Sequence, residues 1–139
     1  MRGRRIAFDY GDVRTGVALC DPDGILASPL TILQSRDKDF LNDVVELITE
    51  HEVIHIYIGL PVHMSGTEGE SVEKVRAFSQ SLAERVNVPI SMVDERLSTV
   101  SAQRQLKDAG VSSRDSKGLI DAMAAVAILE QGLSRENLD

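Results

Sequence analysis

The chain has 139 residues, of which 42% are hydrophobic, and a formal net charge of −7. This length and composition are typical of one globular domain, so we expect a single domain over residues 1–139. The acidic balance argues against a protein that coats nucleic acid through bulk electrostatic attraction. No apolar run could span a bilayer, no secretory signal is evident, and the one cysteine, Cys20, cannot form an internal disulfide. These features predict a cytoplasmic protein without membrane contacts.

Three short apolar runs at the start of the chain predict an antiparallel meander of strands, at residues 4–11, 15–21 and 25–33. Pro22 and Gly24 suit a tight turn between the last two strands. Segment 37–52 has apolar residues at helical spacing and acidic residues in its first turn, which predicts an amphipathic helix. Segment 53–61 is almost entirely apolar and predicts a strand in the middle of a sheet.

The second half of the chain alternates helices with one further strand. We expect a helix at 71–87, a strand at 89–96, a helix at 98–110 and, after a polar connector, a last helix from about Lys117 to Leu133. A meander followed by alternating units predicts an α/β fold. Its five-stranded mixed sheet would combine an antiparallel three-strand meander with two parallel strands, flanked by about four helices.

Two carboxylates end predicted strands. Asp9 closes the first strand and Glu95 closes the fifth. Ligands of open α/β sheets gather beyond the carboxyl ends of the strands, which favours a functional role for both. The alternatives are that Asp9 is a turn residue and that Glu95 is a surface residue paired with Arg96.

Asp121 is the one charged residue in the run 118–129. The run is otherwise glycine and apolar residues and predicts a largely buried helix. A buried carboxylate must be protonated, paired or bound to a metal. The alternative is that Asp121 caps a helix starting at Ala122, but the apolar face begins before it. A cation shared with Asp9 and Glu95 would compensate all three acids.

Hard divalent cations such as Mg²⁺ and Mn²⁺ prefer oxygen ligands of this kind. Two such ions bridged by carboxylates can activate water and stabilise the leaving oxygen of a phosphodiester. Zinc is disfavoured, because there is one cysteine and the three histidines are not spaced as a motif. The acids therefore favour phosphodiester chemistry.

Two further features suit a polyanionic substrate. The glycine-rich stretch 59–69 could bring backbone N–H groups close to a phosphate, although it matches neither the P-loop nor the dinucleotide fingerprint. Basic residues outnumber acidic ones by five to two between 96 and 118, which would also fit solvated helix faces. Tyr10 is the one aromatic residue near the predicted site that could stack on a base.

Taken together, these segments resemble the YqgF (RuvX) family of bacterial proteins, whose RNase H-like fold is related to Holliday junction resolvases. The resemblance rests on four stretches in family order: FDYGDVRTGVAL, IGLPVHMSGTEG, VDERLSTVSAQRQL and KGLIDAMAAVAIL. It implies an RNase H-like nuclease that depends on a metal. The implied substrate is either pre-16S rRNA, processed at its 5′ end during ribosome biogenesis, or branched DNA.

By motif match, the resemblance implies that Asp9, Glu95 and Asp121 are the catalytic acids and bind Mg²⁺ or Mn²⁺. The residues that would contact the substrate are Gly11, Arg14, Gly59, Gly66, Arg96 and Lys117. The chain departs from the family pattern at Ser65, where an acidic or amide residue is expected. The second acid also comes from the fifth strand rather than from the first helix or fourth strand, so Asp94 could share the role of Glu95.

Two other functions fit parts of the sequence. One is a non-catalytic nucleic-acid-binding factor in ribosome assembly, which would use the basic segment 96–118 and ribosome-assembly partners. The other is a sugar-kinase-like ATPase, which also uses an Asp-Gly strand turn. That enzyme would need a second, larger domain, and 139 residues leave no room for one.

Overall fold

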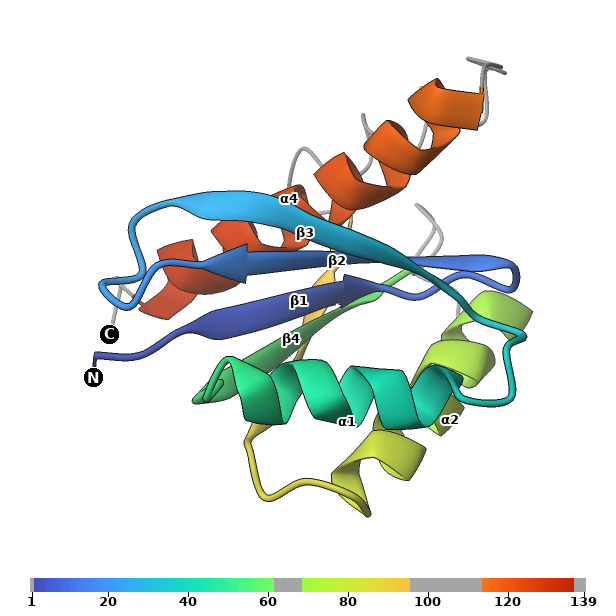
Figure 1. Ribbon diagram of the computed structural model, residues 1–139, viewed down its shortest axis with the longest axis horizontal. Helices are drawn as coiled ribbons and strands as arrows, with labels where there is room; N and C mark the ends of the chain where they lie inside the picture. The colour runs from blue at the N-terminus through green and yellow to red at the C-terminus, as the bar shows by residue number, and fades with distance from the viewer. Residues whose placement is uncertain (1, 62–68, 96–113, 137–139) are drawn as a thin grey trace.

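The computed structural model describes residues 2–61, 69–95 and 114–136, and of residues 114–121 only the course of the helix. Within these ranges it contains five strands and three helices (Figure 1). The strands are β1 (Arg5–Asp9), β2 (Arg14–Cys20), β3 (Ala27–Gln34), β4 (His55–Leu60) and β5 (Ile90–Asp94). The helices are α1 (Phe40–Glu50), α2 (Glu70–Ala83) and α4 (Arg114–Glu136).

The strands form one mixed sheet in the order β3-β2-β1-β4-β5. β1, β2 and β3 pair antiparallel, whereas β4 is parallel to both β1 and β5. The predicted meander and the two predicted parallel strands are thereby confirmed. The turn before β3 also forms as predicted: the N–H of Gly24 donates to the carbonyl of Asp21 at 3.0 Å, and Gly24 takes a φ of 70° that favours glycine.

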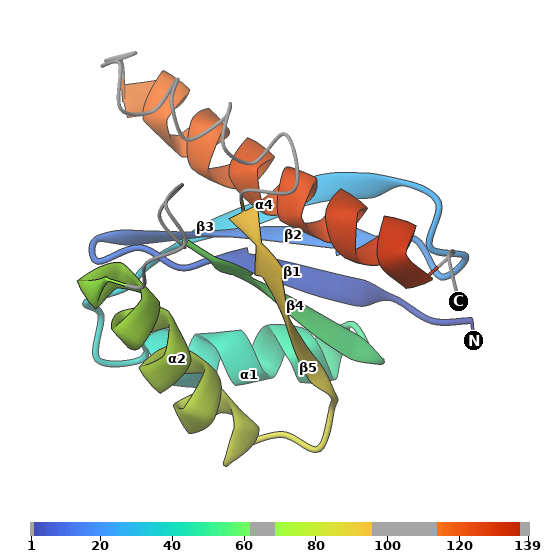
Figure 2. The same cartoon turned by 180° about the vertical axis from the view of Figure 1, so that it is seen from behind.

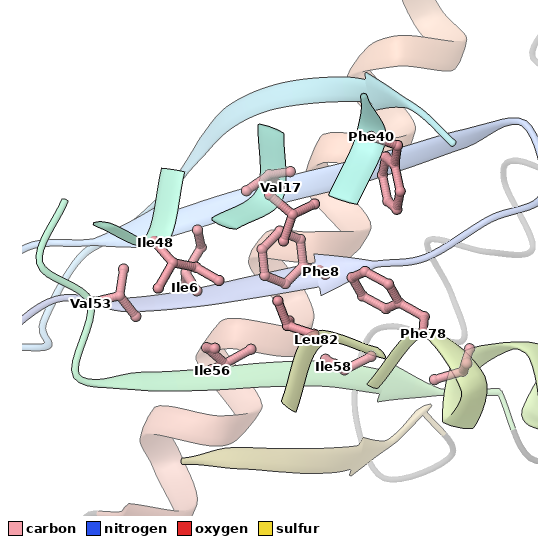
Figure 3. Packing of buried hydrophobic residues seen from close by; sticks show 12 residues of the cluster. Ile6, Phe8, Val17, Phe40, Ile48, Val53, Ile56, Ile58, Phe78 and Leu82 are labelled. Atoms are coloured by element: carbon pink, nitrogen blue, oxygen red, sulfur yellow. The ribbon is translucent and has the colours of Figure 1, made fainter. Parts of the chain in front are cut away.

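The helices cover the two faces of the sheet unequally. α1 and α2 lie on one face and α4 crosses the other (Figures 1 and 2). Strand residues alternate between the faces. In β1, Ile6 and Phe8 pack in the core beneath α1 and α2, where Figure 3 shows them against Phe78 and Leu82. Ala7 packs in the second core, beneath α4.

The layer between the sheet and α4 is built mainly from small side chains. Its buried members include Ala7, Ala18, Ala125, Ala127, Ile128 and Leu129. Cys20 belongs to this layer, where its Sγ accepts a hydrogen bond from the N–H of Arg5 at 3.1 Å. Burial raises the pKa of the Cys20 thiol, which suits a core residue rather than a reactive one.

The last helix differs from its prediction at both ends. α4 begins at Arg114 rather than near Lys117, and it ends at Glu136 rather than at Leu133. The predicted connector and tail are polar, but polar residues also form helix ends that extend beyond an apolar face. Because the helix begins seven residues earlier, Asp121 is not its N-cap. The helix predicted at 98–110 lies outside the described residues.

Candidate active site

Asp9 is buried on the α4 face of the sheet. It ends β1, and the alternation of the strand puts it on the same side as Arg5 and Ala7. The residue has an exposed fraction of 3%. Its partner across the antiparallel pair is Gly16. The position of β2 directly opposite Asp9 therefore carries no side chain.

Glu95 directly follows β5 and is also buried, with an exposed fraction of 5%. Its carboxylate lies over β4: a Cβ built on Gly59 would be 2.8 Å from its Oε1. The same position would be 2.5 Å from Cδ1 of Ile128 in α4. Glu95 therefore lies on the α4 face, in space that Gly59 leaves open and beside a side chain of α4.

The register of the sheet brings Asp9 and Glu95 to the same level. Phe8 pairs with Ile58 in the parallel pair of β1 and β4, so the next residues, Asp9 and Gly59, stand side by side. Neighbouring strands are about 4.8 Å apart. Glu95 itself follows β5, two strands from β1, but its carboxylate lies over Gly59 of β4, so it lies beside Asp9 on the same face at the carboxyl edge.

Asp94 has a different environment. It pairs with Leu60 at the end of β4. Leu60 packs against the core beneath α1 and α2, and paired residues share a face. The register therefore puts Asp94 on the opposite face from Asp9 and Glu95, which favours Glu95 over Asp94 as the partner of Asp9.

Asp121 lies within α4, the helix that covers the face bearing both acids. Its side chain is outside the described part of the structure. Among the described side chains, no group of three histidines, cysteines or acids is placed to hold a metal ion. Of the three predicted acids, these described side chains include Asp9 and Glu95.

The turn after β1 needs glycine at position 11. A Cβ on Gly11 would be 2.5 Å from the carbonyl oxygen of Arg14, so any other residue would open the turn. Arg14, predicted to contact the substrate, begins β2 and is partly buried. The turn therefore holds Arg14 close to the end of β1.

An ion pair that the sequence did not suggest fastens this turn to α2. Nζ of Lys74 lies 3.1 Å from Asp12 and 3.5 Å from Glu70. The hydrogen bond with Asp12 raises the pKa of Lys74. The pair is exposed, so it contributes little to stability, and its consequence is to join the loop beside Asp9 to the start of α2.

The remaining predicted substrate contacts are only partly covered by the structure. Gly66 and Arg96 lie outside the described residues, and Lys117 lies in α4 without a described side chain. Gly59 is described, and its observed role is to make room for Glu95. Glycine inside a strand commonly marks such a close approach, which is the sequence signal for this role.

Similarity to known proteins identifies the family of this chain. A family model described as "RuvX: Holliday junction resolvase" matches residues 3–135. This chain belongs to the RuvX family. A relative from Streptomyces coelicolor, named as a pre-16S rRNA nuclease, is 45% identical over 139 residues, covering 99% of this chain and 83% of the relative. A Mycobacterium leprae protein of the same name is 45% identical over 136 residues, covering 96% and 74%.

Solved structures confirm the predicted RNase H-like fold of this RuvX protein. Thermus thermophilus RuvC in complex with a Holliday junction substrate matches with a TM-score of 0.61 and 12% identity, over 97% of this chain and 96% of RuvC. Another structure of the same RuvC matches with a TM-score of 0.56 over 96% of each chain. At this identity the match concerns the fold alone.

The family assigns the general activity as well. As a RuvX protein the chain is a nuclease, a hydrolase of phosphodiester bonds that acts on nucleic acid. Of the helices that the structure describes, none has both the length and the hydropathy needed to cross a membrane.

Proposed function

We propose that this nuclease processes the 5′ end of pre-16S rRNA, using Mg²⁺ or Mn²⁺ held by Asp9, Glu95 and Asp121. One observation carries the proposal: the buried carboxylate of Glu95 lies over β4, beside the buried Asp9 at the end of β1, on the face covered by the helix that contains the third acid. Residues 1–139 would act as a single domain in the cytoplasm.

The donor set fits a hard divalent cation. Asp9 and Glu95 offer carboxylate oxygens, the ligands that Mg²⁺ and Mn²⁺ prefer. The residues directly beside Asp9 on the two neighbouring strands are glycines, Gly16 and Gly59, and the Glu95 carboxylate occupies the space over Gly59. A cation between converging carboxylates also reduces the electrostatic cost of burying them.

The position of Asp121 along α4 supports its place as the third ligand. Asp121 precedes Ile128 by seven residues, which is about two helical turns. Positions seven apart lie on the same side of a helix. Ile128 is the residue of α4 that reaches the space over Gly59, beside Glu95. Position 121 is therefore on the same side of α4 as Ile128, about two turns closer to the start of the helix, which supports Asp121 as the third ligand.

The ion would supply the chemistry that carboxylates cannot: it polarises the phosphate, favours deprotonation of water and stabilises the leaving oxygen. The residues of the chain would hold the ion and orient the substrate. Asp9 and Glu95 fix the site on rigid strands, and the turn closed by Gly11 directs the start of β2, with Arg14, toward the same edge. Arg14, Lys117 and the predicted contacts at Gly66 and Arg96 would bind the substrate backbone.

The relatives that match nearly the whole chain indicate which substrate this nuclease acts on. They are named for pre-16S rRNA, which supports a ribosomal precursor as substrate and assembling ribosomal subunits as partners. The family description supports branched DNA as a second candidate. Both polymers present the same phosphodiester chemistry, so a direct comparison must decide between them.

The test is a cleavage assay with two substrates. The purified protein and its Asp9→Asn variant are incubated with a 16S rRNA precursor and with a four-way DNA junction, with Mg²⁺, Mn²⁺ or EDTA. The proposal expects metal-dependent cleavage near the 5′ end of the precursor by the wild type alone. Cleavage of the junction and not of the RNA would select the second candidate, and equal cleavage by Asp9→Asn would overturn the site.

A further inference from the structure

The C-terminal end of α4 is joined to two strands by a partly buried polar network. Nη2 of Arg5, in β1, donates to Oε1 of Glu136 at 2.8 Å. The hydroxyl of Tyr57, in β4, donates to the other oxygen of the same carboxylate, Oε2. Nη1 of Arg5 also donates to the carbonyl of Gly3 at 2.7 Å. One carboxylate thus joins α4 to the two strands that carry Asp9 and Gly59.

This network contributes little to the free energy of folding, but its directional hydrogen bonds fix the position of α4 relative to the strands. The Arg5 and Glu136 side chains are 9% and 32% exposed, so pairing them requires the removal of water from both charges. Buried ion pairs often contribute no more stability than apolar residues of similar size, whereas their directional hydrogen bonds can specify one packing arrangement. The bonds to both oxygens of Glu136 fix its position against two neighbouring strands.

The described part of the α4 interface combines a few large side chains, such as Ile128 and Leu129, with many small ones. Several of its buried residues are small, among them Ala124, Ala125, Ala127 and Gly132. At Gly132 the helix backbone lies against the ring of Tyr57, where a Cβ would be 2.6 Å from a ring carbon. Small residues let a helix approach closely but interlock less than large ones, so the polar anchor supplies what they lack.

A shift of α4 would be felt at the candidate active site. Ile128 stands about 12 Å from Glu136 along the helix, and it borders the space that the Glu95 carboxylate occupies. Asp121 is about 22 Å from Glu136 on the same helix. Because a helix moves as a rigid element, its anchored end determines where both positions lie.

We infer that Arg5, Tyr57 and Glu136 are positioning residues that set the register of α4 over the sheet and thereby the arrangement of the metal-binding acids. This role rests on the proposed function, since it acts through Glu95 and Asp121. Arg5 begins β1, whereas Asp9 ends it, so the bond between Arg5 and Glu136 lies at the opposite end of that strand from the candidate active site. The role is therefore distinct from binding substrate or metal.

The test replaces the polar network by apolar residues of similar size, in the variant Arg5→Met/Tyr57→Phe/Glu136→Leu. A matched control, Arg2→Gln/Asp23→Asn, removes an exposed ion pair of 3.0 Å at the same end of the molecule. Melting temperature, Mn²⁺ affinity and kcat are measured for each protein. Spin labels are attached to cysteines introduced at the exposed positions Glu46 and Glu130. Double electron–electron resonance then measures the distance from α1 to α4.

The triple variant is expected to melt no lower than the wild type but to show a shifted or broadened label distance. Its Mn²⁺ affinity and kcat should fall roughly tenfold or more, because a misplacement of about 1 Å can cost about a hundredfold in rate. The control should match the wild type in all four measurements. If the triple variant does not fold, Glu136→Gln is measured in its place, with the same expected changes in distance, affinity and kcat.

Two outcomes would overturn the inference: an unchanged label distance, or a wild-type Mn²⁺ affinity and kcat despite a changed distance. Failure of the proposed function is distinguishable from both. In that case the wild type itself would neither bind Mn²⁺ nor cleave, and the label distance would still decide whether the network fixes α4.

Discussion

The carboxylate of Glu95 occupies the space that Gly59 leaves by having no side chain. A Cβ at position 59 would be 2.8 Å from Oε1 of Glu95, closer than two such atoms can approach. The two residues belong to neighbouring parallel strands, and only their combination lets a glutamate after β5 reach over β4 toward Asp9. The glycine in β4 therefore determines where the carboxylate that follows β5 can lie.

The contact predicts that Gly59→Ala impairs activity more than stability. The added methyl group would displace the ends of two side chains, Glu95 and Ile128, which can move at a cost of about 1 kcal/mol in the free energy of unfolding. The displaced carboxylate should lower kcat roughly tenfold or more. Urea unfolding and cleavage rates measure the two effects.

A second substitution separates the two contacts. In Gly59→Ala/Ile128→Val the overlap with Cδ1 of Ile128 is removed, so stability should recover, whereas Glu95 stays displaced and the rate stays low. Recovery of the rate together with stability would show that Gly59 acts through packing alone.

The register predicts opposite effects for two adjacent acids. Glu95→Gln removes a charge on the face of Asp9, and Asp94→Asn removes one on the other face. We expect the cleavage rate to fall by roughly a hundredfold or more in Glu95→Gln and to change less than threefold in Asp94→Asn. Single-turnover assays at saturating Mn²⁺ compare them. A larger loss in Asp94→Asn would mean that the register argument is wrong.

The sequence predicted the five strands and their directions, because each strand of the meander is short, apolar and bounded by turn residues. It also selected Asp9 and Glu95 as candidates from their places at strand ends. It could not choose between Asp94 and Glu95. That choice depends on the pairing of Asp94 with Leu60, which is set by contacts between strands distant in the chain.

The full length of α4 was missed for a related reason. Residues beyond Leu133 are polar, and polarity is typical of tails. Glu136 is helical because its carboxylate meets Arg5 and Tyr57, residues 131 and 79 positions earlier in the chain. No local pattern carries that information, so tertiary contacts override the local preference.

The same contacts predict how stability depends on pH. Burial alone would raise the pKa of Glu136, but the hydrogen bond from Tyr57 and the charge of Arg5 outweigh it and hold the pKa below its ordinary value of 4.5. A carboxyl group whose pKa is lowered by folding stabilises the fold above its unfolded-state pKa. That contribution is lost as the pH falls through the lower pKa of the folded state.

Wild type and Glu136→Gln should therefore differ by a constant free energy of unfolding between about pH 7 and pH 8, where His55, whose pKa burial lowers and Glu136 raises, is neutral in both proteins. The difference should shrink as the pH falls below 4.5 and vanish once the folded-state carboxyl is protonated. Urea unfolding at a series of pH values measures it. A difference that grows in acid would contradict the ionised Arg5–Glu136 pair.

The most direct test of the central claim is thermal unfolding of the wild type and of Asp121→Asn with increasing Mn²⁺. A ligand that binds only the native state stabilises it, by about 2.7 kcal/mol at a concentration one hundred times its Kd. If Asp121 joins Asp9 and Glu95 around a cation, Mn²⁺ should raise the melting temperature of the wild type and leave that of Asp121→Asn unchanged. An equal rise in both proteins, or none in the wild type, would contradict a metal site built from these three acids.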